Sequence, residues 1–439
     1  MKIINIVPGF GGTFYCGNCL RDREFSYALK ESGHEAVSLP IYLPLTIENG
    51  VIKSDKPIFF SAVEIYIKQK VPFLRNMPKW LEKLLNAPFI LKFAAKKAGS
   101  TRADGLEEMT ISMLNGNEGY QKEELQFLID FLRDHEKPDV IHLSNALLMG
   151  VAKEIKKQLH IPVVCSLQDE DVWVDAMKPS YQQHLWDLLS EKGNDIDAFV
   201  AVSHYFAEFM KEKMRIPDEK MHVVHIGIDP SKYNYHQPNI NIPTIGYLSR
   251  IYKDNGFGVL VDAFIHLKTT TKYTNAKLNI TGGLTGDDKR FVTKQIKKLK
   301  KANVFHDVAF IDDFRVEALN DFFKNLSLLS VPVLKGEAFG PYLLESLACG
   351  IPIVQPALGA FPEIVATTKG GFIYDPNTPE ALAEKWVDVF NDQEALLKAS
   401  KNGHDAILNT FNTKILTKRM ITVYEKVTLK KKKEVFVIE

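Results

Sequence analysis

The chain has 439 residues, of which 45% are hydrophobic, 10% aromatic and 25% charged, which excludes a disordered, collagen-like or coiled-coil protein and predicts two or three domains. The 55 Lys and Arg residues balance 54 Asp and Glu residues to a net charge of +1, so nucleic acid is not an expected partner and any anion site must be local. Four cysteines are too few for a disulfide scaffold, so we expect a reducing compartment, the cytoplasm.

The first half of the chain alternates apolar strands with helical segments. Residues 2–7 predict a buried strand, a glycine loop follows, and an amphipathic segment ends at Gly33 before a second strand at 34–40. This strand–helix–strand unit predicts the start of a doubly wound parallel sheet. Further strands are expected at 139–144, 162–167, 197–203 and 222–226. We therefore expect an N-terminal Rossmann-like domain over residues 1–235.

A basic, aromatic segment interrupts this alternation. Residues 56–97 carry nine Lys or Arg against two Glu and are broken by prolines. Two interpretations stay open: a helical insertion over about 56–130 that packs Phe59 and Trp80 against the domain, or a weak contact with the anionic inner face of a membrane. No apolar run approaches the roughly 18 residues that a membrane span needs, so any membrane association is expected to be peripheral.

A second alternation of strands and helices begins after a polar, proline-containing linker at 236–243. The strands TIGYLS, KLNIT, DVAFID, LSLLSVP and IPIVQ are separated by helical segments, which predicts a second doubly wound domain over 243–405. Two such domains leave a cleft at the carboxyl ends of their strands, where open α/β sheets bind ligands. The fold class is therefore α/β, with two Rossmann-like domains.

The most informative segment is 335–365. A loop ends at Gly340, Pro341 suits the first position of a helix, and Gly350 suits its end. The backbone N–H groups from about Phe339 to Tyr342 would then point out of a helix N-terminus. Such a terminus binds anions, so we expect a phosphate or diphosphate here.

Two carboxylates bracket this predicted phosphate site. Glu337 lies on the loop before the helix, and Glu345 lies about one turn inside it. Carboxylates do not hold a phosphate, but they accept hydrogen bonds from hydroxyl groups. The combination favours a nucleotide sugar as the ligand.

The spacing of these two residues, E-x7-E within EAFGPYLLESLACGIPIV, resembles the signature of family four of the retaining GT-B-fold glycosyltransferases. The resemblance covers most of the chain and includes GFGG, DAFVAVS, IGIDPSKY, YLSRIYKDNG, TGG and FPEIV. It implies the GT-B architecture, two Rossmann-like domains facing a central cleft, with the donor held mostly by the C-terminal domain and the acceptor by the N-terminal one. It also implies that a C-terminal helix, over 406–439, crosses back to the first domain.

The resemblance implies a role for each matching residue. Glu337 would contact the hydroxyls of the donor sugar, Glu345 the ribose and Arg250 the diphosphate. Further donor contacts are implied for the N-terminal glycine loop and for the backbone that faces the base, at Gly11, Gly12, Asp313 and Phe314.

Two positions depart from the family pattern. In the family pattern an Arg is followed five residues later by Lys-Gly, whereas here Arg250 is followed by Asn255 and Gly256. One of the two charges that would neutralise the phosphates is therefore missing, and Lys253 is the candidate substitute. On the acceptor side the usual His is Gln168, which hydrogen-bonds hydroxyls but does not titrate near pH 7. In this family the acceptor proton is thought to pass to the leaving phosphate, so the candidate catalytic residues stay Glu337 and Gln168.

Other chemistries have weaker support. Cys16 and Cys19 have metal or redox spacing, but no second pair completes a zinc site. Acidic pairs at 287–288 and 312–313 suggest a divalent metal, yet GT-B enzymes generally use helix dipoles and basic side chains, so we expect no metal and no cofactor. Three histidines are expected to be structural: His142, His204 and His225.

The sequence thus predicts a cytoplasmic, metal-independent, retaining glycosyltransferase. We expect it to move a hexose-type sugar from a UDP-, GDP- or ADP-linked donor to a hydroxyl of a sugar or lipid-linked acceptor. Two alternatives stay open: a nucleotide-sugar epimerase or phosphorolytic enzyme of the same architecture, and a non-catalytic nucleotide-sugar-binding partner subunit, which Asn255 and Gln168 favour. No motif names the donor base, the acceptor or the oligomeric state.

Overall fold

The computed structural model describes residues 1–9, 17–42, 47–48, 51–52, 59, 103 and 105–438. Its contacts divide the chain into two compact units. The first is built mainly from residues up to Val224 and from the segment after Leu416, and the second spans His225–Leu416. Each unit is described by itself below.

The first unit contains a six-stranded parallel sheet in the order β2-β1-β5-β6-β7-β8. Every residue of the three consecutive strands β5, β6 and β7 is buried, as expected for parallel strands covered on both faces. The strands are β1 (Lys2–Val7), β2 (Glu35–Pro40), β5 (Val140–Leu143), β6 (Val163–Leu167), β7 (Ala198–Ala201) and β8 (Met221–Val223). The last strand ends earlier than expected, so His225 lies beyond it.

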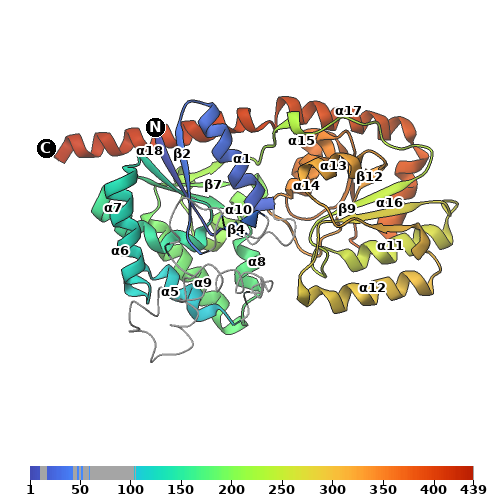
Figure 1. The fold of residues 1–439 in the computed structure, drawn as a ribbon, viewed down its shortest axis with the longest axis horizontal. Coiled ribbons are helices and arrows are strands. Elements are labelled where there is room, and N and C mark those ends of the chain that lie inside the picture. Colours follow the sequence, from blue (N-terminus) through green and yellow to red (C-terminus); the bar gives the residue numbers. More distant parts are fainter. Residues whose placement is uncertain are drawn as a thin grey trace. The chain divides into compact units, whose positions relative to one another are not determined.

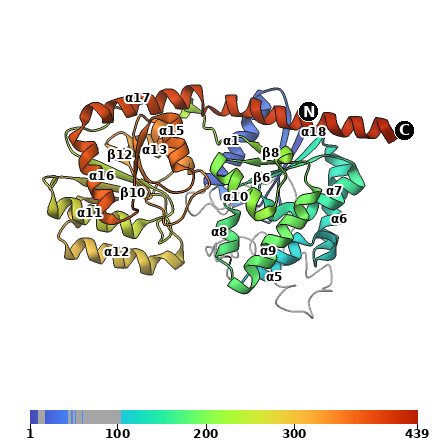
Figure 2. The ribbon, with the colours of Figure 1, turned by 180° about the vertical axis from the view of Figure 1, so that it is seen from behind.

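Besides the C-terminal helix, seven α-helices of 6 to 15 residues accompany this sheet in the described part of the chain. They are α1 (Gly17–Glu31), α5 (Glu107–Leu114), α6 (Lys122–Phe131), α7 (Ala152–Leu159), α8 (Glu170–Asp175), α9 (Pro179–Lys192) and α10 (His204–Met214). Figures 1 and 2 show α6 beside α7, and α5 packs on α9. A short hairpin joins β3 (Ile47–Glu48) to β4 (Val51–Ile52).

Part of the predicted insertion at 56–130 is described. The ring of Phe59 is buried and packs against Phe127 and Phe131 of α6, at centroid distances of 5.4 and 5.2 Å. This confirms the expected packing role for Phe59. Trp80 and most of the basic segment lie outside the described residues.

The second unit contains another six-stranded parallel sheet, in the order β11-β10-β9-β12-β13-β14. Its strands are β9 (Thr244–Leu248), β10 (Lys277–Thr281), β11 (Val308–Phe310), β12 (Leu328–Leu329), β13 (Ile353–Pro356) and β14 (Gly371–Tyr374). Two parallel sheets with surrounding helices confirm the predicted α/β class with two doubly wound domains.

Helices cover both faces of this second sheet (Figure 1). One face carries α11 (Phe257–Thr270), α12 (Lys289–Lys301) and α16 (Pro379–Asn391). The other carries α13 (Val316–Phe323), α14 (Pro341–Ala348) and α15 (Phe361–Thr368), with α17 (Gln393–Asn409) packed on α14 and α15.

The strand order reverses between β9 and β12. From β9 the chain proceeds through β10 to β11 on one side, and then returns to β12 on the other side of β9. The carboxyl ends of strands at such a reversal are where open α/β sheets bind ligands. The loops that leave these two ends carry Arg250 and Glu337.

Residues 406–439 do not form one uninterrupted helix. Helix α17 ends at Asn409, and α18 (Thr413–Ile438) begins after a short break. The Oδ1 of Asn412 accepts a hydrogen bond from the backbone N–H of Lys414, which caps the new helix. From Thr417 onward α18 belongs to the first unit, and the phenol of Tyr424 is 2.7 Å from Nδ1 of His142. Within the described residues, no helix combines the length and the apolarity that crossing a membrane requires.

Candidate functional site

Helix α14 begins where the predicted loop ends. Gly340 is its N-cap, with a positive φ of 88°, and Pro341 occupies the first helical position. Because glycine offers no side chain, the first turn receives no side-chain cap. The N-terminus of α14 thus keeps its positive dipole end available to an external acceptor, as an anion site requires. Phe339, one residue earlier, is fully buried and its ring packs against His225 and Phe411.

Glu337 is half-buried on the loop between β12 and α14. The phenol of Tyr342, in the first turn of α14, donates a 2.5 Å hydrogen bond to Oε2 of Glu337. The backbone of Glu337 is also held, because its carbonyl accepts from the N–H of Ala360 at 3.0 Å. Gly359 has a φ of 57°, and a Cβ there would lie 2.4 Å from the Glu337 nitrogen. Only glycine therefore allows these two loops to lie so close.

Glu345 is buried, with 3% of its surface exposed. The phenol of Tyr233 donates to Oε1 of Glu345 at 2.9 Å. Both predicted carboxylates therefore receive a hydrogen bond from a tyrosine. Tyr233 ends the motif IGIDPSKY, but nothing in that motif predicts its bond to Glu345. Tyr342 is predicted only as part of the helix N-terminus, not as a donor to Glu337.

Arg250 follows β9 and is paired with Asp288. Its guanidinium donates to both carboxylate oxygens of Asp288, at 3.0 and 3.3 Å, and to Oγ1 of Thr285 at 3.0 Å. Asp288 also accepts from the backbone and hydroxyl of Thr285, which completes a capping box before α12. The charge of Arg250 is therefore compensated within the protein. The acidic pair at 287–288 contributes an ion pair here.

Asn255 holds the loop that carries Arg250. Its Nδ2 donates to Oγ of Ser249 at 2.6 Å and to the carbonyl of Arg250 at 3.2 Å. The buried phenol of Tyr247 donates to the same Arg250 carbonyl at 3.0 Å. Where the family has a charged side chain, this chain has an amide that shapes the loop. Lys253 is exposed, and no carboxylate in the described part of the chain pairs with it.

The loops after β9 and β12 are joined. The N–H of Leu334 donates to the carbonyl of Asp254 at 2.8 Å. Gly256, with a φ of 73°, caps α11, and a Cβ there would lie 1.6 Å from the carbonyl oxygen of Pro332. The fold thus brings the loop of Arg250 and Asn255 to the loop of Glu337.

Asp313 follows β11, at the same carboxyl edge of the sheet but two strands away from β9. Its carboxylate accepts from the side chain of Arg315, and this pair lowers the pKa of Asp313 to about 2. Its carbonyl accepts a long hydrogen bond from Thr281 at 3.4 Å. Phe314 beside it is half-buried.

Gln168 lies in the first unit, directly after β6. Its Nε2 donates to the carbonyl of Ser144 at 2.8 Å, while its Oε1 is buried without a hydrogen-bond partner among the described residues. Glu170 accepts from the N–H groups of Gln168 and Ala146, at 2.7 and 2.8 Å, and so joins the ends of β5 and β6. Burial raises the pKa of Glu170 to about 8, against the lowering by these N–H groups.

Several expected residues lie elsewhere. Gly11, Gly12 and Cys16 are outside the described residues, so their predicted roles stay predictions. His142 is buried between Ser166 and Tyr424, at 2.8 and 2.7 Å, which confirms a structural role. His225 pairs with Glu363 at 2.8 Å.

Comparison with known proteins shows the family. Residues 235–406 match the family model of glycosyl transferases group 1, and residues 113–232 match that of Glycosyltransferase Family 4. The N-acetyl-alpha-D-glucosaminyl L-malate synthase of Bacillus anthracis is 23% identical over 303 residues, which are 66% of this chain and 75% of that protein. An uncharacterized glycosyltransferase of Methanocaldococcus jannaschii is 23% identical over 276 residues, 62% and 71% of the two chains.

Solved structures show the same fold. The sucrose-phosphate synthase of Thermosynechococcus elongatus has a TM-score of 0.70 at 16% identity, covering 97% of this chain and 99% of that one. HepE of Anabaena, solved in complex with UDP, has a TM-score of 0.66 at 15% identity, covering 97% and 100%. The chain is therefore a glycosyltransferase of the GT-B fold, related to the group 1 and family 4 glycosyltransferases.

Proposed function

We propose that this glycosyltransferase moves a hexose-type sugar from a nucleoside diphosphate to a hydroxyl acceptor with retention of configuration. The observation that carries the proposal is the arrangement of Glu337 and Glu345 around the N-terminus of α14. One carboxylate lies on the loop before the helix and the other one turn inside it, and each accepts a hydrogen bond from a tyrosine phenol. These phenols orient the carboxylates for the hydroxyls of sugar and ribose.

The diphosphate is proposed to bind the N-terminus of α14. Negative charge develops on the leaving diphosphate, and oriented N–H groups and cations stabilise it. Arg250 contributes less than its position suggests, because Asp288 already compensates its charge. Lys253, exposed on the same loop, is the cation we assign to the diphosphate. Positioning and electrostatics supply the catalysis in this scheme, and no metal ion is needed for it.

UDP is the first donor nucleotide to test. HepE of Anabaena has been solved with UDP and with UDP-glucose, and it shares the fold over nearly the whole chain. The GDP and ADP conjugates are the remaining candidates. We propose that the backbone near Asp313 and Phe314 faces the base.

The acceptor is proposed to be a sugar or lipid-linked hydroxyl compound that binds the first unit. Relatives include an enzyme named as a lipopolysaccharide core mannosyltransferase in Rhizobium meliloti, 25% identical over 202 residues. The buried Oε1 of Gln168 is an acceptor that a substrate hydroxyl can satisfy. The acceptor proton then passes to the leaving phosphate oxygen, so Gln168 orients the hydroxyl without accepting its proton.

The proposed compartment is the cytoplasm, since Cys165 and Cys349 are buried free thiols. A peripheral membrane contact through 56–97 stays a prediction, because that segment lies almost entirely outside the described residues.

Nucleotide binding and transfer test the proposal separately. Calorimetric titration with UDP, GDP and ADP, without metal and with magnesium, should show one nucleotide binding in both conditions. The E337Q variant should keep nucleotide binding but lose about 100-fold or more in transfer, because an amide cannot replace the oriented carboxylate. The E384Q variant, at an exposed carboxylate of α16, is the matched control and should transfer normally. Binding only with magnesium, or normal transfer by E337Q, would contradict the scheme.

A further inference from the structure

A hollow lies in the second unit, at the edge of the sheet opposite to the proposed donor site. Its volume is about 440 Å³. Three segments line it: the linker at 239–243, the loop at 272–275 before β10, and the junction of α16 and α17 at 390–396. The first two segments lead into the amino ends of β9 and β10, whereas the loop of Glu337 leaves the carboxyl end of β12. The hollow is therefore separate from the proposed donor site.

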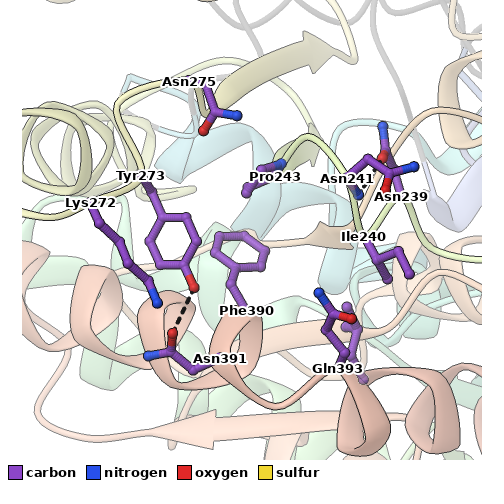
Figure 3. A pocket seen from close by; sticks show the side chains of 11 residues that line it. Asn239, Ile240, Asn241, Pro243, Lys272, Tyr273, Asn275, Phe390, Asn391 and Gln393 are labelled. Carbon is purple, nitrogen blue, oxygen red and sulfur yellow. Dashed lines mark hydrogen bonds between the residues drawn. The ribbon is translucent and has the colours of Figure 1, made fainter.

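Aromatic rings form one wall of the hollow (Figure 3). Tyr273 and Phe390 meet edge to face, with ring centroids 5.4 Å apart. The phenol of Tyr273 donates to Oδ1 of Asn391 at 2.8 Å, which fixes the ring, and the ammonium of Lys272 lies 5.3 Å from its centre. The wall is thus preformed and offers an apolar surface beside one cation.

Amide side chains surround this aromatic wall (Figure 3). Asn241, Asn275 and Gln393 are exposed, and within the described residues none of their side chains makes a hydrogen bond. Asn239 differs, because its Oδ1 accepts from the N–H groups of Asn241 and Ile242, both at 3.1 Å, and so shapes the linker. Three amides from three separate segments are therefore available to a ligand. None of the residues lining the hollow carries a carboxylate.

The amides, the aromatic wall and the single lysine together favour one class of ligand. An amide donates and accepts hydrogen bonds at once, which matches hydroxyl groups that do the same. The aromatic wall suits the C–H face of a sugar ring. Without a carboxylate the hollow offers no negative charge to a metal ion, and the ammonium of Lys272 over the Tyr273 ring opposes an organic cation. A single lysine is too little charge for a polyanion.

We infer that this hollow binds a neutral glycosyl unit of an oligosaccharide, at a site distinct from donor and acceptor sites. Ile240 at its rim is 40% exposed, so the hollow is open and a glycan chain can continue past it into solvent. A site of this kind holds a long glycan to the enzyme away from the reacting hydroxyl. The inference goes beyond the proposed function, and its test is a binding measurement that does not require transfer.

The test uses the full chain with two neutral probes, maltohexaose and chitohexaose. Calorimetry or saturation-transfer NMR should detect binding of at least one probe at millimolar concentration. The double variant N241A/Q393A removes two amides from exposed positions, and it should weaken that binding about tenfold or more. T274A is the matched control, since Thr274 is exposed between two lining residues without lining the hollow itself. It should bind as the unaltered chain does.

Two results would overturn the inference. One is the absence of binding by both probes up to about 20 mM, a concentration that fills a weak site with a dissociation constant of about 1 mM almost completely. The other is binding that N241A/Q393A leaves unchanged, because the probe then occupies another surface. The E337Q variant separates the two proposals, since it should lose transfer and keep probe binding.

Discussion

The phenol of Tyr342 donates a 2.5 Å hydrogen bond to Oε2 of Glu337, across the start of α14. The Tyr342 side chain is almost fully buried, at 2% exposure, so the direction of its hydroxyl is set by packing. A residue in the first turn of the helix thereby fixes the carboxylate on the loop before it. The orientation of Glu337 is therefore built into the free protein.

Removing this hydroxyl should slow transfer more than it weakens the fold. In Y342F the ring keeps its packing, while Glu337 loses one donor, so we expect kcat to fall about tenfold and stability to fall by about 1–2 kcal/mol. Steady-state kinetics and thermal unfolding measure the two effects. Y424F is the control, because the phenol of Tyr424 is also buried and hydrogen-bonded to a side chain, His142, but in the first unit. An equal fall of kcat in both variants would mean that Tyr342 acts only through stability.

A methyl group at Gly359 should displace Glu337. In G359A the new Cβ would lie 2.4 Å from the nitrogen and 2.5 Å from the oxygen of Glu337, so the loop must shift. We expect transfer to fall about 100-fold, as a displacement of about 1 Å can cause. G33A has a similar positive φ, 83°, but no atom within 4 Å of its Cβ, so it carries only the backbone strain. The idea fails if the two variants lose the same small amount of activity.

The ion pair of Arg250 and Asp288 should contribute far more to stability than an exposed pair. Arg250 is 15% and Asp288 7% exposed, and D288N removes a charge that accepts from both Arg250 and Thr285. We expect a loss of about 2–4 kcal/mol in the free energy of unfolding. D262N breaks the exposed pair with Lys298 and should cost less than about 1 kcal/mol. Chemical denaturation compares them, and equal losses would contradict the difference in burial.

Glu170 should make stability fall as the pH rises. Its pKa is about 8 in the folded chain, raised by burial from an ordinary 4.5, so between these values the folded chain holds a proton that the unfolded chain releases. Unfolding is then favoured with increasing pH, at up to about 1.4 kcal/mol per pH unit. Thermal unfolding from pH 5 to 8 should show a steeper decline for the unaltered chain than for E170Q. Parallel curves would show that Glu170 is ionised in the folded chain.

The fold is readable from the sequence wherever a strand is buried on both faces. Runs such as those of β1, β6 and β9 have no polar alternation, and glycine or proline marks their ends. Weaker elements escape this rule. β14 is only partly buried and begins on the second of two glycines, so no continuous apolar run predicts it. The break between α17 and α18 depends on the cap by Asn412, a contact that periodicity does not report.

The sequence predicts the local structure of the site but not the long-range contacts of its residues. The start of α14 at Gly340 and Pro341 follows from local chain chemistry, and the structure has it as predicted. The partners of Arg250 and Glu345 do not follow, because Asp288 and Tyr233 are 38 and 112 residues away in sequence. Pairing over such distances depends on the packed fold. The same holds for Asn255, whose role in the loop emerges only from its contacts.

The bond between Tyr424 and His142 joins residues 282 positions apart in the chain. Tyr424 is fully buried, so the first sheet has its complete core only when α18 is in place. During synthesis the ribosome must therefore make the whole second unit before the first can close. Until then an apolar strip beside β5 stays exposed to solvent and to other chains. The last segment of the chain to be made thus completes the first sheet to be made. Expression of the first half of the chain without α18 should therefore give an aggregation-prone product.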